Sequence, residues 1–246
     1  MKINIRNISV EITRRCNLKC AHCCRGNAEN IDIDYKYIDS LLDQVEYIHF
    51  LTFTGGEPSL NSPAIQYFVN ECKRRNVKLD YVVIFTNGIN IKQDFIDVCL
   101  DTWNFVNKGM SVYLSDDIYH TTQKKYDDSL LKSLSFYKKQ SNYKDSDHPL
   151  TEGRGQFLKE SKYYGAKAAK FTSINDFDSD NHYITLNVYG KIINGIDFSY
   201  ENQKIHKLCN VKKLTMFYNS LDEKTKSEII PMVIDSWNVP LVDILK

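Results

Sequence analysis

The stretch Cys16-Asn17-Leu18-Lys19-Cys20-Ala21-His22-Cys23 decides the fold of this chain, together with Thr54-Gly55-Gly56-Glu57-Pro58 further along. The first segment places three thiols within eight residues. Four thiolates normally saturate a cubane iron-sulfur cluster. Three leave one iron open to a substrate or a chelating ligand, and we expect the chemistry of the chain at that open iron.

The CxxxCxxC spacing and the Gly-Gly-Glu stretch resemble the signature of the radical S-adenosylmethionine (radical SAM) superfamily. In that family the cysteine loop follows the first strand of a barrel, and Gly-Gly-Glu ends the second strand. Here the cysteines follow a strand-like run at residues 5–13, and Gly55 follows another at 48–54. This placement is harder to produce by chance than either motif alone. The resemblance implies a partial (β/α)6 barrel of the α/β class.

The same resemblance implies one [4Fe-4S] cluster on Cys16, Cys20 and Cys23, with S-adenosyl-L-methionine (SAM) on the open iron. An oxidoreductase-like enzyme is then expected, which cleaves SAM to a 5′-deoxyadenosyl radical that takes hydrogen from an unidentified small-molecule, nucleotide or peptide substrate. Reducing a sulfonium needs a low-potential electron donor of the flavodoxin or ferredoxin type. A glycyl-radical-enzyme activating enzyme and a peptide maturase are alternatives within the family.

An alternative of another class is a non-catalytic iron-sulfur or zinc-binding module. Zinc requires four ligands, and the fourth would be His22, Cys24 or a remote residue. Four cysteines lie outside the motif: Cys24, Cys72, Cys99 and Cys209. They show no close pairing apart from Cys24 beside Cys23, and Gly195 stands about where relatives with an auxiliary cluster carry a cysteine. We therefore expect no complete SPASM-type or twitch-type cluster domain.

Several residues at predicted strand ends resemble family positions that contact SAM. Each has a simpler interpretation as well: Gly-Gly and Asn-Gly are common in turns, Ser115 fits a helix N-cap, and an arginine beside a glycine fits a surface turn. The predicted cofactor-binding residues are His22, Gly55, Gly56, Glu57, Thr86, Asn87, Ser115, Asp116 and Arg154.

Hydrophobic periodicity alternates between strand and helix, which predicts a parallel sheet with right-handed crossovers. Strands are expected at 5–13, 48–54, 78–86 and 109–115, and helices at 34–47, 63–75, 93–103 and 127–139. A hairpin is expected at 183–188 and 191–198, followed by helices at 220–230 and 231–245. We assign residues 1–210 to the radical SAM core and 211–246 to a helical extension packed on it.

Composition limits the possible partners and compartment. The chain has 246 residues and a formal net charge of +1, so no overall charge favours nucleic acid or an anionic membrane. No stretch approaches the roughly 20 apolar residues that span a bilayer. Seven cysteines, three of them crowded together, suit a metal site in a reducing compartment. These features predict a cytoplasmic protein without a membrane or nucleic-acid partner.

Overall fold

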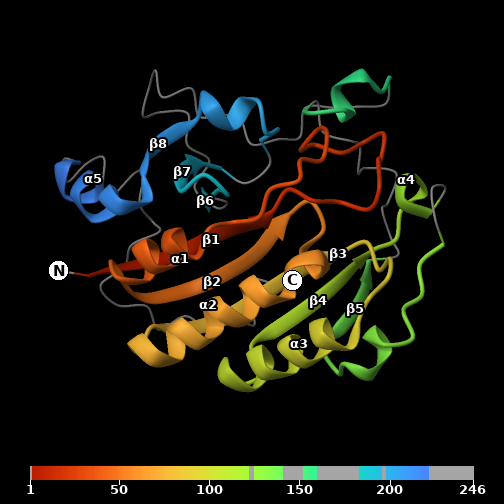
Figure 1. Ribbon diagram of the computed structural model, residues 1–246, viewed down its shortest axis with the longest axis horizontal. Coiled ribbons are helices and arrows are strands. Elements are labelled where there is room, and N and C mark those ends of the chain that lie inside the picture. Colours follow the sequence, from red (N-terminus) through yellow and green to blue (C-terminus); the bar gives the residue numbers. More distant parts are fainter. Residues whose placement is uncertain (1, 122–124, 141–151, 160–182, 196–197, 222–246) are drawn as a thin grey trace.

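The computed structural model describes residues 2–121, 125–140, 152–159, 183–195 and 198–221. They form one eight-stranded sheet in the order β5-β4-β3-β2-β1-β6-β7-β8 (Figure 1). Its strands are β1 (Ile3–Thr13), β2 (Val45–Gly55), β3 (Lys78–Thr86), β4 (Met110–Ser115), β5 (Tyr137–Gln140), β6 (Ile184–Leu186), β7 (Lys191–Asn194) and β8 (Lys207–Asn210).

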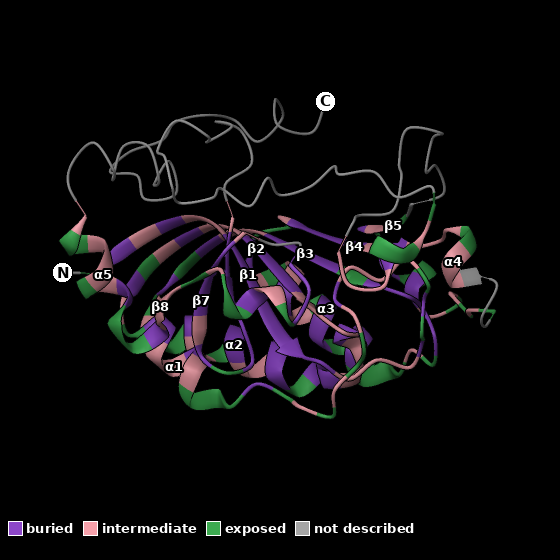
Figure 2. Ribbon diagram, turned by 90° about the horizontal axis from the view of Figure 1, so that it is seen from above, coloured by how far each residue is buried: buried purple, intermediate pink, exposed green. Residues whose placement is uncertain are grey.

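Strands β1 to β5 are parallel and lie in sequence order, and β6 pairs with the other side of β1, also in parallel. The principal helices are α1 (Tyr35–Leu42), α2 (Ser62–Arg75), α3 (Gln93–Phe105), α4 (Ile118–Thr121) and α5 (Leu214–Ser220). Helices α1, α2 and α3 lie on one face of the sheet (Figure 2). The predicted α/β class is thus confirmed.

The core lies between this helical layer and the sheet. Strand β1 contributes Ile8, Val10 and Ile12, all fully buried, and β2 contributes Phe53, whose ring packs edge-to-face on Phe68 of α2 at 5.4 Å between centroids. Residues on one face of a strand recur every second position, which is the periodicity read from the sequence. This packing fixes the carboxyl ends of β1 and β2 relative to each other, and the cysteine loop starts there.

The helix predicted over 127–139 is wrong. Asp127 accepts a hydrogen bond from the Ser129 backbone nitrogen, only Leu131–Ser133 forms a 3₁₀ turn, and Tyr137–Gln140 is strand β5 beside β4. The buried pair Leu131 and Leu134 has helical spacing, but an unpaired edge of β4 offers the following residues a ladder of backbone hydrogen bonds. Tertiary pairing therefore overrides the local pattern.

The predicted hairpin is confirmed as β6 and β7, which are antiparallel. Its turn contains Gly190 at φ +69°, and the Asn187 side chain accepts from the backbone nitrogens of Tyr189 and Lys191. Strand β8 and helix α5 were not predicted. Most of the predicted helices at 220–230 and 231–245 lies outside the described residues.

Near the proposed domain boundary, Val211 and Leu214 are buried in the main core. Gln44, between α1 and β2, donates to the Val211 carbonyl and accepts from the Thr215 backbone nitrogen. The start of the predicted extension thus packs on the sheet domain, while its division from the core at residue 210 stays a prediction.

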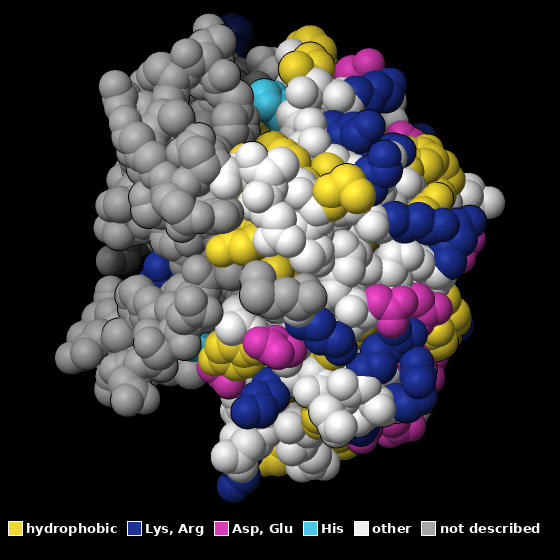
Figure 3. All heavy atoms as spheres, turned by 90° about the vertical axis from the view of Figure 1, so that its left-hand side faces the viewer, with side chains coloured by type: hydrophobic (Ala, Val, Ile, Leu, Met, Phe, Trp, Pro, Cys, Tyr) yellow, Lys and Arg dark blue, Asp and Glu magenta, His cyan; other side chains and the backbone are white. Residues whose placement is uncertain are grey.

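The outer surface carries both signs of charge. Figure 3 views the molecule from the left-hand side of Figure 1, and on this face lysines and arginines lie beside acidic side chains. Among the described residues, no helix has the length and apolar character needed to cross a membrane.

Candidate functional site

The three motif cysteines lie in the loop that leaves the carboxyl end of β1. Cys20 is buried, Cys16 and Cys23 are half-buried, and all three pack with the buried side chains of Leu18 and Ile89. Burial raises the pKa of Cys16 to about 11. Three cysteines that pack on one small apolar cluster are a donor set that fits an iron-sulfur cluster, whose binding displaces the thiol protons.

The two glycines of the second motif let the cysteine loop approach the end of β2 closely. The Gly56 backbone nitrogen donates to the Thr13 carbonyl at 2.9 Å, and the Glu57 nitrogen donates to the Arg15 carbonyl at 2.8 Å. A Cβ atom on Gly56 would lie 2.1 Å from the Arg15 oxygen, and one on Gly55 would lie 2.0 Å from the Thr13 oxygen. Only glycine permits this close backbone approach.

Glu57 joins the ends of β2 and β3. Its buried carboxylate accepts from the Thr86 hydroxyl at 2.7 Å, the Asn87 backbone nitrogen at 2.8 Å and the Ser59 backbone nitrogen at 3.1 Å. The Asn87 side chain in turn donates to Asn17 of the cysteine loop at 2.8 Å. The structure therefore brings Glu57, Thr86 and Asn87 together, while their contact with SAM stays a prediction. Asn17, which sequence reasoning missed, connects them to the cysteine loop.

Beyond β4, two further aromatic rings, those of Tyr119 and His120, lie beside His22 of the cysteine loop. His22 stacks on Tyr119 at 4.6 Å and meets His120 edge-on at 4.8 Å. Burial lowers the pKa of His22 to about 4, although Asp117 lies 3.7 Å from its Nε2 and raises it in part. His22 is thus neutral at pH 7, and its buried Nδ1 has no hydrogen-bond partner in the part of the chain that the structure describes.

His120 and Asp117 form a close pair at the start of α4. His120 Nδ1 lies 2.6 Å from Asp117 Oδ2. Burial lowers the pKa of His120, but the neighbouring Asp117 and Cys20 outweigh it and raise this pKa to about 10. Ligand atoms of Cys20, His22 and His120 all lie within 4.8 Å of one another. The sequence signal for this pair was the D-x-x-H spacing, which sets both side chains on one helical turn.

Ser115 and Asp116 lie at the carboxyl end of β4, where parallel sheets present their ligand-binding residues. The Asp116 carboxylate is engaged by Lys139 of β5 at 2.9 Å. The predicted contacts of both residues with SAM stay predictions.

Arg154 braces the cysteine loop from outside. Its Nε donates to the Cys20 carbonyl at 2.9 Å and its Nη1 to the Gly26 carbonyl at 2.5 Å, while its backbone nitrogen donates to the Cys23 carbonyl at 2.9 Å. The family resemblance predicts that Arg154 contacts SAM, and this contact stays a prediction. In the structure, the Arg154 guanidinium also holds the backbone of the cysteine loop through the Cys20 and Gly26 carbonyls.

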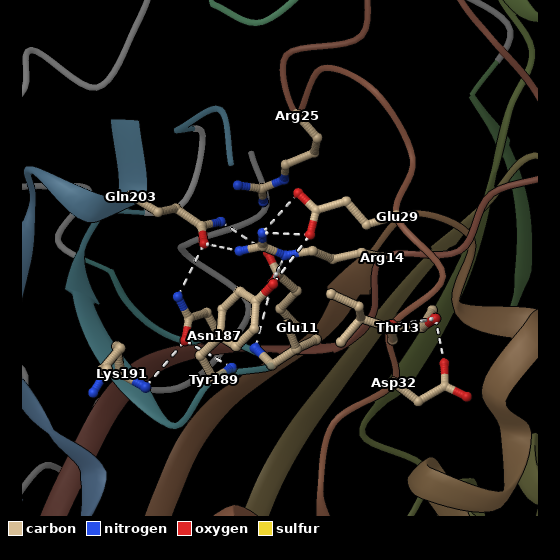
Figure 4. A network of polar contacts seen from close by, with 12 residues as sticks. Glu11, Thr13, Arg14, Arg25, Glu29, Asp32, Asn187, Tyr189, Lys191 and Gln203 are labelled. Atoms are coloured by element: carbon tan, nitrogen blue, oxygen red, sulfur yellow. Dashed lines mark hydrogen bonds and ion pairs between the residues drawn. The ribbon is translucent and has the colours of Figure 1, made fainter. Parts of the chain in front are cut away.

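A buried polar network that the sequence did not reveal lies directly behind the loop (Figure 4). Arg14, two residues before Cys16, contacts Glu11 at 2.8 Å, Glu29 at 3.1 Å and Gln203 at 2.8 Å. Its guanidinium also lies 4.1 Å from the centre of the Tyr200 ring. The network ties the cysteine loop to the segment that precedes β8.

Comparison with known proteins gives one family. A model of the radical SAM superfamily matches residues 10–112. An uncharacterized protein of Methanocaldococcus jannaschii is 35% identical over 85 residues, covering 32% of this chain and 29% of that protein. The tungsten-containing aldehyde ferredoxin oxidoreductase cofactor-modifying protein of Pyrococcus furiosus is 30% identical over 126 residues, covering 48% of this chain and 33% of that protein. The matched segments thus span about a third of each relative.

The fold agrees with a solved structure described as native anSMEcpe with bound AdoMet and Cp18Cys peptide. The TM-score is 0.56 at 14% sequence identity, and the match covers 92% of this chain and 82% of that one. The segment that matches the radical SAM superfamily, residues 10–112, includes both the cysteine loop and the Gly-Gly-Glu stretch.

Proposed function

We propose that this chain is a radical SAM enzyme that holds one [4Fe-4S] cluster on Cys16, Cys20 and Cys23. The observation that carries the proposal is that these three cysteines pack on one small apolar cluster with Leu18 and Ile89, next to the ends of β2 and β3. When bound, the cluster and SAM would supply one-electron cleavage of the sulfonium, giving methionine and a 5′-deoxyadenosyl radical. An external low-potential donor would supply the electron.

The chain's own residues would hold SAM and keep water away from it. The strand-end residues Gly55, Gly56 and Glu57 are proposed to contact its amino group, and His22 to lie along its adenine. Ser115, Asp116, Thr86 and Asn87 line the same edge of the sheet, where parallel α/β folds bind ligands. Leu18 and Ile89 supply the apolar cover that limits solvent access to an iron-sulfur site.

The substrate is proposed to be a small molecule, a nucleotide or a peptide that gives up a hydrogen atom to the radical. A peptide has one specific observation in its favour, because the solved structure that shares this fold holds a peptide. A cofactor is suggested by the name of the Pyrococcus furiosus relative. Feeding members of each class and measuring stimulated 5′-deoxyadenosine formation separates these candidates.

The enzyme proposal is tested with anaerobically reconstituted protein, dithionite and SAM. We expect release of 5′-deoxyadenosine, and we expect Cys20→Ala to abolish it. Cys209→Ala is the matched control, because Cys209 lies on β8 outside the cysteine loop, and it is expected to retain activity. Wild-type protein that carries an intact cluster but does not cleave SAM would instead support the non-catalytic alternative.

Iron content tests the proposal of a single cluster. Three motif cysteines predict about four irons per chain, as in one [4Fe-4S] cluster. About eight irons would mean that the remaining cysteines assemble a second cluster. Zinc in place of iron in protein purified without oxygen would favour the zinc module.

A further inference from the structure

The aromatic pair Phe85 and Tyr113 lies on the face of the sheet opposite helices α1, α2 and α3. On β3, Val82 and Ile84 are fully buried in the core. Because successive side chains of a strand point to opposite faces, Phe85 points away from the helical layer. Phe85 stands in register with Tyr113 of β4, and their rings stack at 5.4 Å between centroids with 21° between their planes.

The exposure of Phe85 does not fit its place in the sheet. Strand β3 is paired on both sides, with β2 and β4, yet the Phe85 ring is 41% exposed. Val83, two residues earlier on the same face, is only 4% exposed. Phe85 directly precedes Thr86, the last residue of β3, and parallel α/β sheets bind their ligands at this edge. An exposed apolar ring at this place indicates a binding surface if polar groups flank it.

A cation flanks the pair on its other side. Lys138 of β5 stands in register with Tyr113, and its Nζ lies 5.4 Å from the centre of the Tyr113 ring and donates to the hydroxyl at 3.4 Å. Lys138 forms no ion pair with any residue that the structure describes, whereas Lys139 beside it pairs with Asp116 at 2.9 Å. An ammonium has three donors, so Lys138 keeps donors for an anion.

A second stacked pair, in the helical layer, has a different neighbour. The rings of Tyr35 and Tyr67 stack at 4.1 Å, and Tyr35 is 38% exposed. There the Tyr67 hydroxyl donates to the Asp39 carboxylate at 3.0 Å, and Asp39 is itself paired with Arg75. The pair on the sheet differs because the charge beside it is positive and because it lies at the ligand-binding edge.

We propose that Phe85, Tyr113 and Lys138 bind a small molecule that carries a planar aromatic ring and an anionic group. The ring stacks on Phe85, and the anion accepts hydrogen bonds from Lys138. This assignment rests on the proposed function, since the molecule bound there would be the substrate. Two sources share the chemistry: a nucleotide with its phosphate, and an aromatic carboxylic acid.

The test is isothermal titration calorimetry on the reconstituted full chain without SAM, with uridine 5′-monophosphate and 4-hydroxybenzoate as probes. We expect one probe to bind to wild type, and that probe identifies the source. Phe85→Leu keeps apolar bulk but lacks the ring, so its affinity is expected to fall about tenfold. Phe85→Trp restores an aromatic surface and is expected to bind as wild type does.

Lys138→Gln tests the anion separately, and its exposed position makes the variant independent of packing at Phe85. It is expected to weaken the charged probe about tenfold. The uncharged counterpart, uridine or 4-hydroxybenzamide, is expected to bind wild type and Lys138→Gln equally. Equal weakening of the charged and uncharged probes would contradict the role given to the ammonium.

Tyr35→Leu is the matched control for the ring, and Lys132→Gln, which removes a lysine paired with Asp128 at 2.9 Å, is the control for the charge. Both are expected to bind the probe as wild type does. Binding of neither probe to wild type, or equal affinities of Phe85→Leu and Tyr35→Leu, would overturn the proposal. Weaker SAM binding by Phe85→Leu with unchanged probe affinity would overturn it too, and would assign the ring to the adenine of SAM.

Failure of the proposed function gives a different result. Probe binding is measured without SAM, and release of 5′-deoxyadenosine is measured on the same preparation. Protein that binds the probe through Phe85 and Lys138 but does not cleave SAM would keep the binding site and contradict the enzyme.

Discussion

Gly56 occupies the point where the backbone of β2 comes closest to the loop that carries the cysteines. Its nitrogen bonds the Thr13 carbonyl, and the space that a side chain would need is taken by the Arg15 carbonyl. The family resemblance assigns this glycine to SAM. The structure shows that the absence of a side chain at Gly56 is also required for the cysteine loop to pack against the end of β2.

Gly56→Ala is expected to destabilise the fold by ~1–3 kcal/mol and to lower cluster loading, because a methyl group 2.1 Å from a backbone oxygen forces the loop away. Thermal unfolding and iron content measure both effects. Gly26→Ala is the comparison: Gly26 has φ +93°, but its Cβ would meet nothing nearer than 4.0 Å. Backbone strain alone is expected there, at a cost of about 1 kcal/mol. Equal loading in both variants would contradict the steric argument.

Among elements, the cysteine loop has no helix or strand of its own and is held by contacts from three others. Gly56 and Glu57 bind its start, Asn87 binds Asn17, and Arg154 binds the carbonyls near its end. If the loop presents three thiols to one cluster, as proposed, it gains from such support, since cofactor sites tolerate little displacement.

Arg154→Met is expected to reduce iron retention several-fold under a chelator challenge, because it removes the donors to the Cys20 and Gly26 carbonyls while keeping similar bulk. Arg154→Lys keeps the positive charge but lacks the two-pronged guanidinium donors, so its iron retention is expected to stay close to that of Arg154→Met. Chelator-resistant iron, measured over time, checks both. If both variants retain iron normally but bind SAM weakly, the family-derived role of pairing with the SAM carboxylate is the dominant one.

The sequence predicted the elements whose pattern is set by the layered core and missed those set by pairing at the sheet edges. Strand β3 was predicted at its observed bounds because Val82 and Ile84 face the core with strand periodicity. The segment at 127–139 failed because Leu131 and Leu134 show helical spacing, while the edge of β4 decides the outcome. Local periodicity carries no information on a free edge elsewhere in the sheet.

The candidate site likewise contains residues that the sequence predicted and residues that it missed. The cysteines and Glu57 were predicted because short motifs mark them. His120 and Arg14 were not, since the sequence does not show that they lie near distant residues such as Cys20 and Gln203. A single sequence shows the residue types of such contacts but not their proximity.

At the scale of the whole molecule, one buried network connects the first strand to the last part of the described sheet. Glu11 of β1 is fully buried, and Arg14 is 3% exposed. Gln203 donates to Glu11 at 2.8 Å and accepts from Arg14 at 2.8 Å, and Asn187 joins it from the β6–β7 turn (Figure 4). The C-terminal strands are thereby fastened to the base of the cysteine loop.

Arg14→Met is expected to destabilise the fold by ~3–5 kcal/mol, because it leaves the Glu11 carboxylate buried without its counter-charge. For a chain of this length the melting temperature would fall by roughly 10 °C. The double variant Glu11→Gln with Arg14→Met removes both charges and is expected to recover part of the loss, as a double-mutant cycle would show. Arg15→Met is the control: Arg15 pairs with Asp32 at 2.9 Å, but its side chain is 34% exposed, so ~1 kcal/mol or less is expected. If Arg14→Met and Arg15→Met have the same melting temperature, the buried network does not hold the C-terminal strands to the loop.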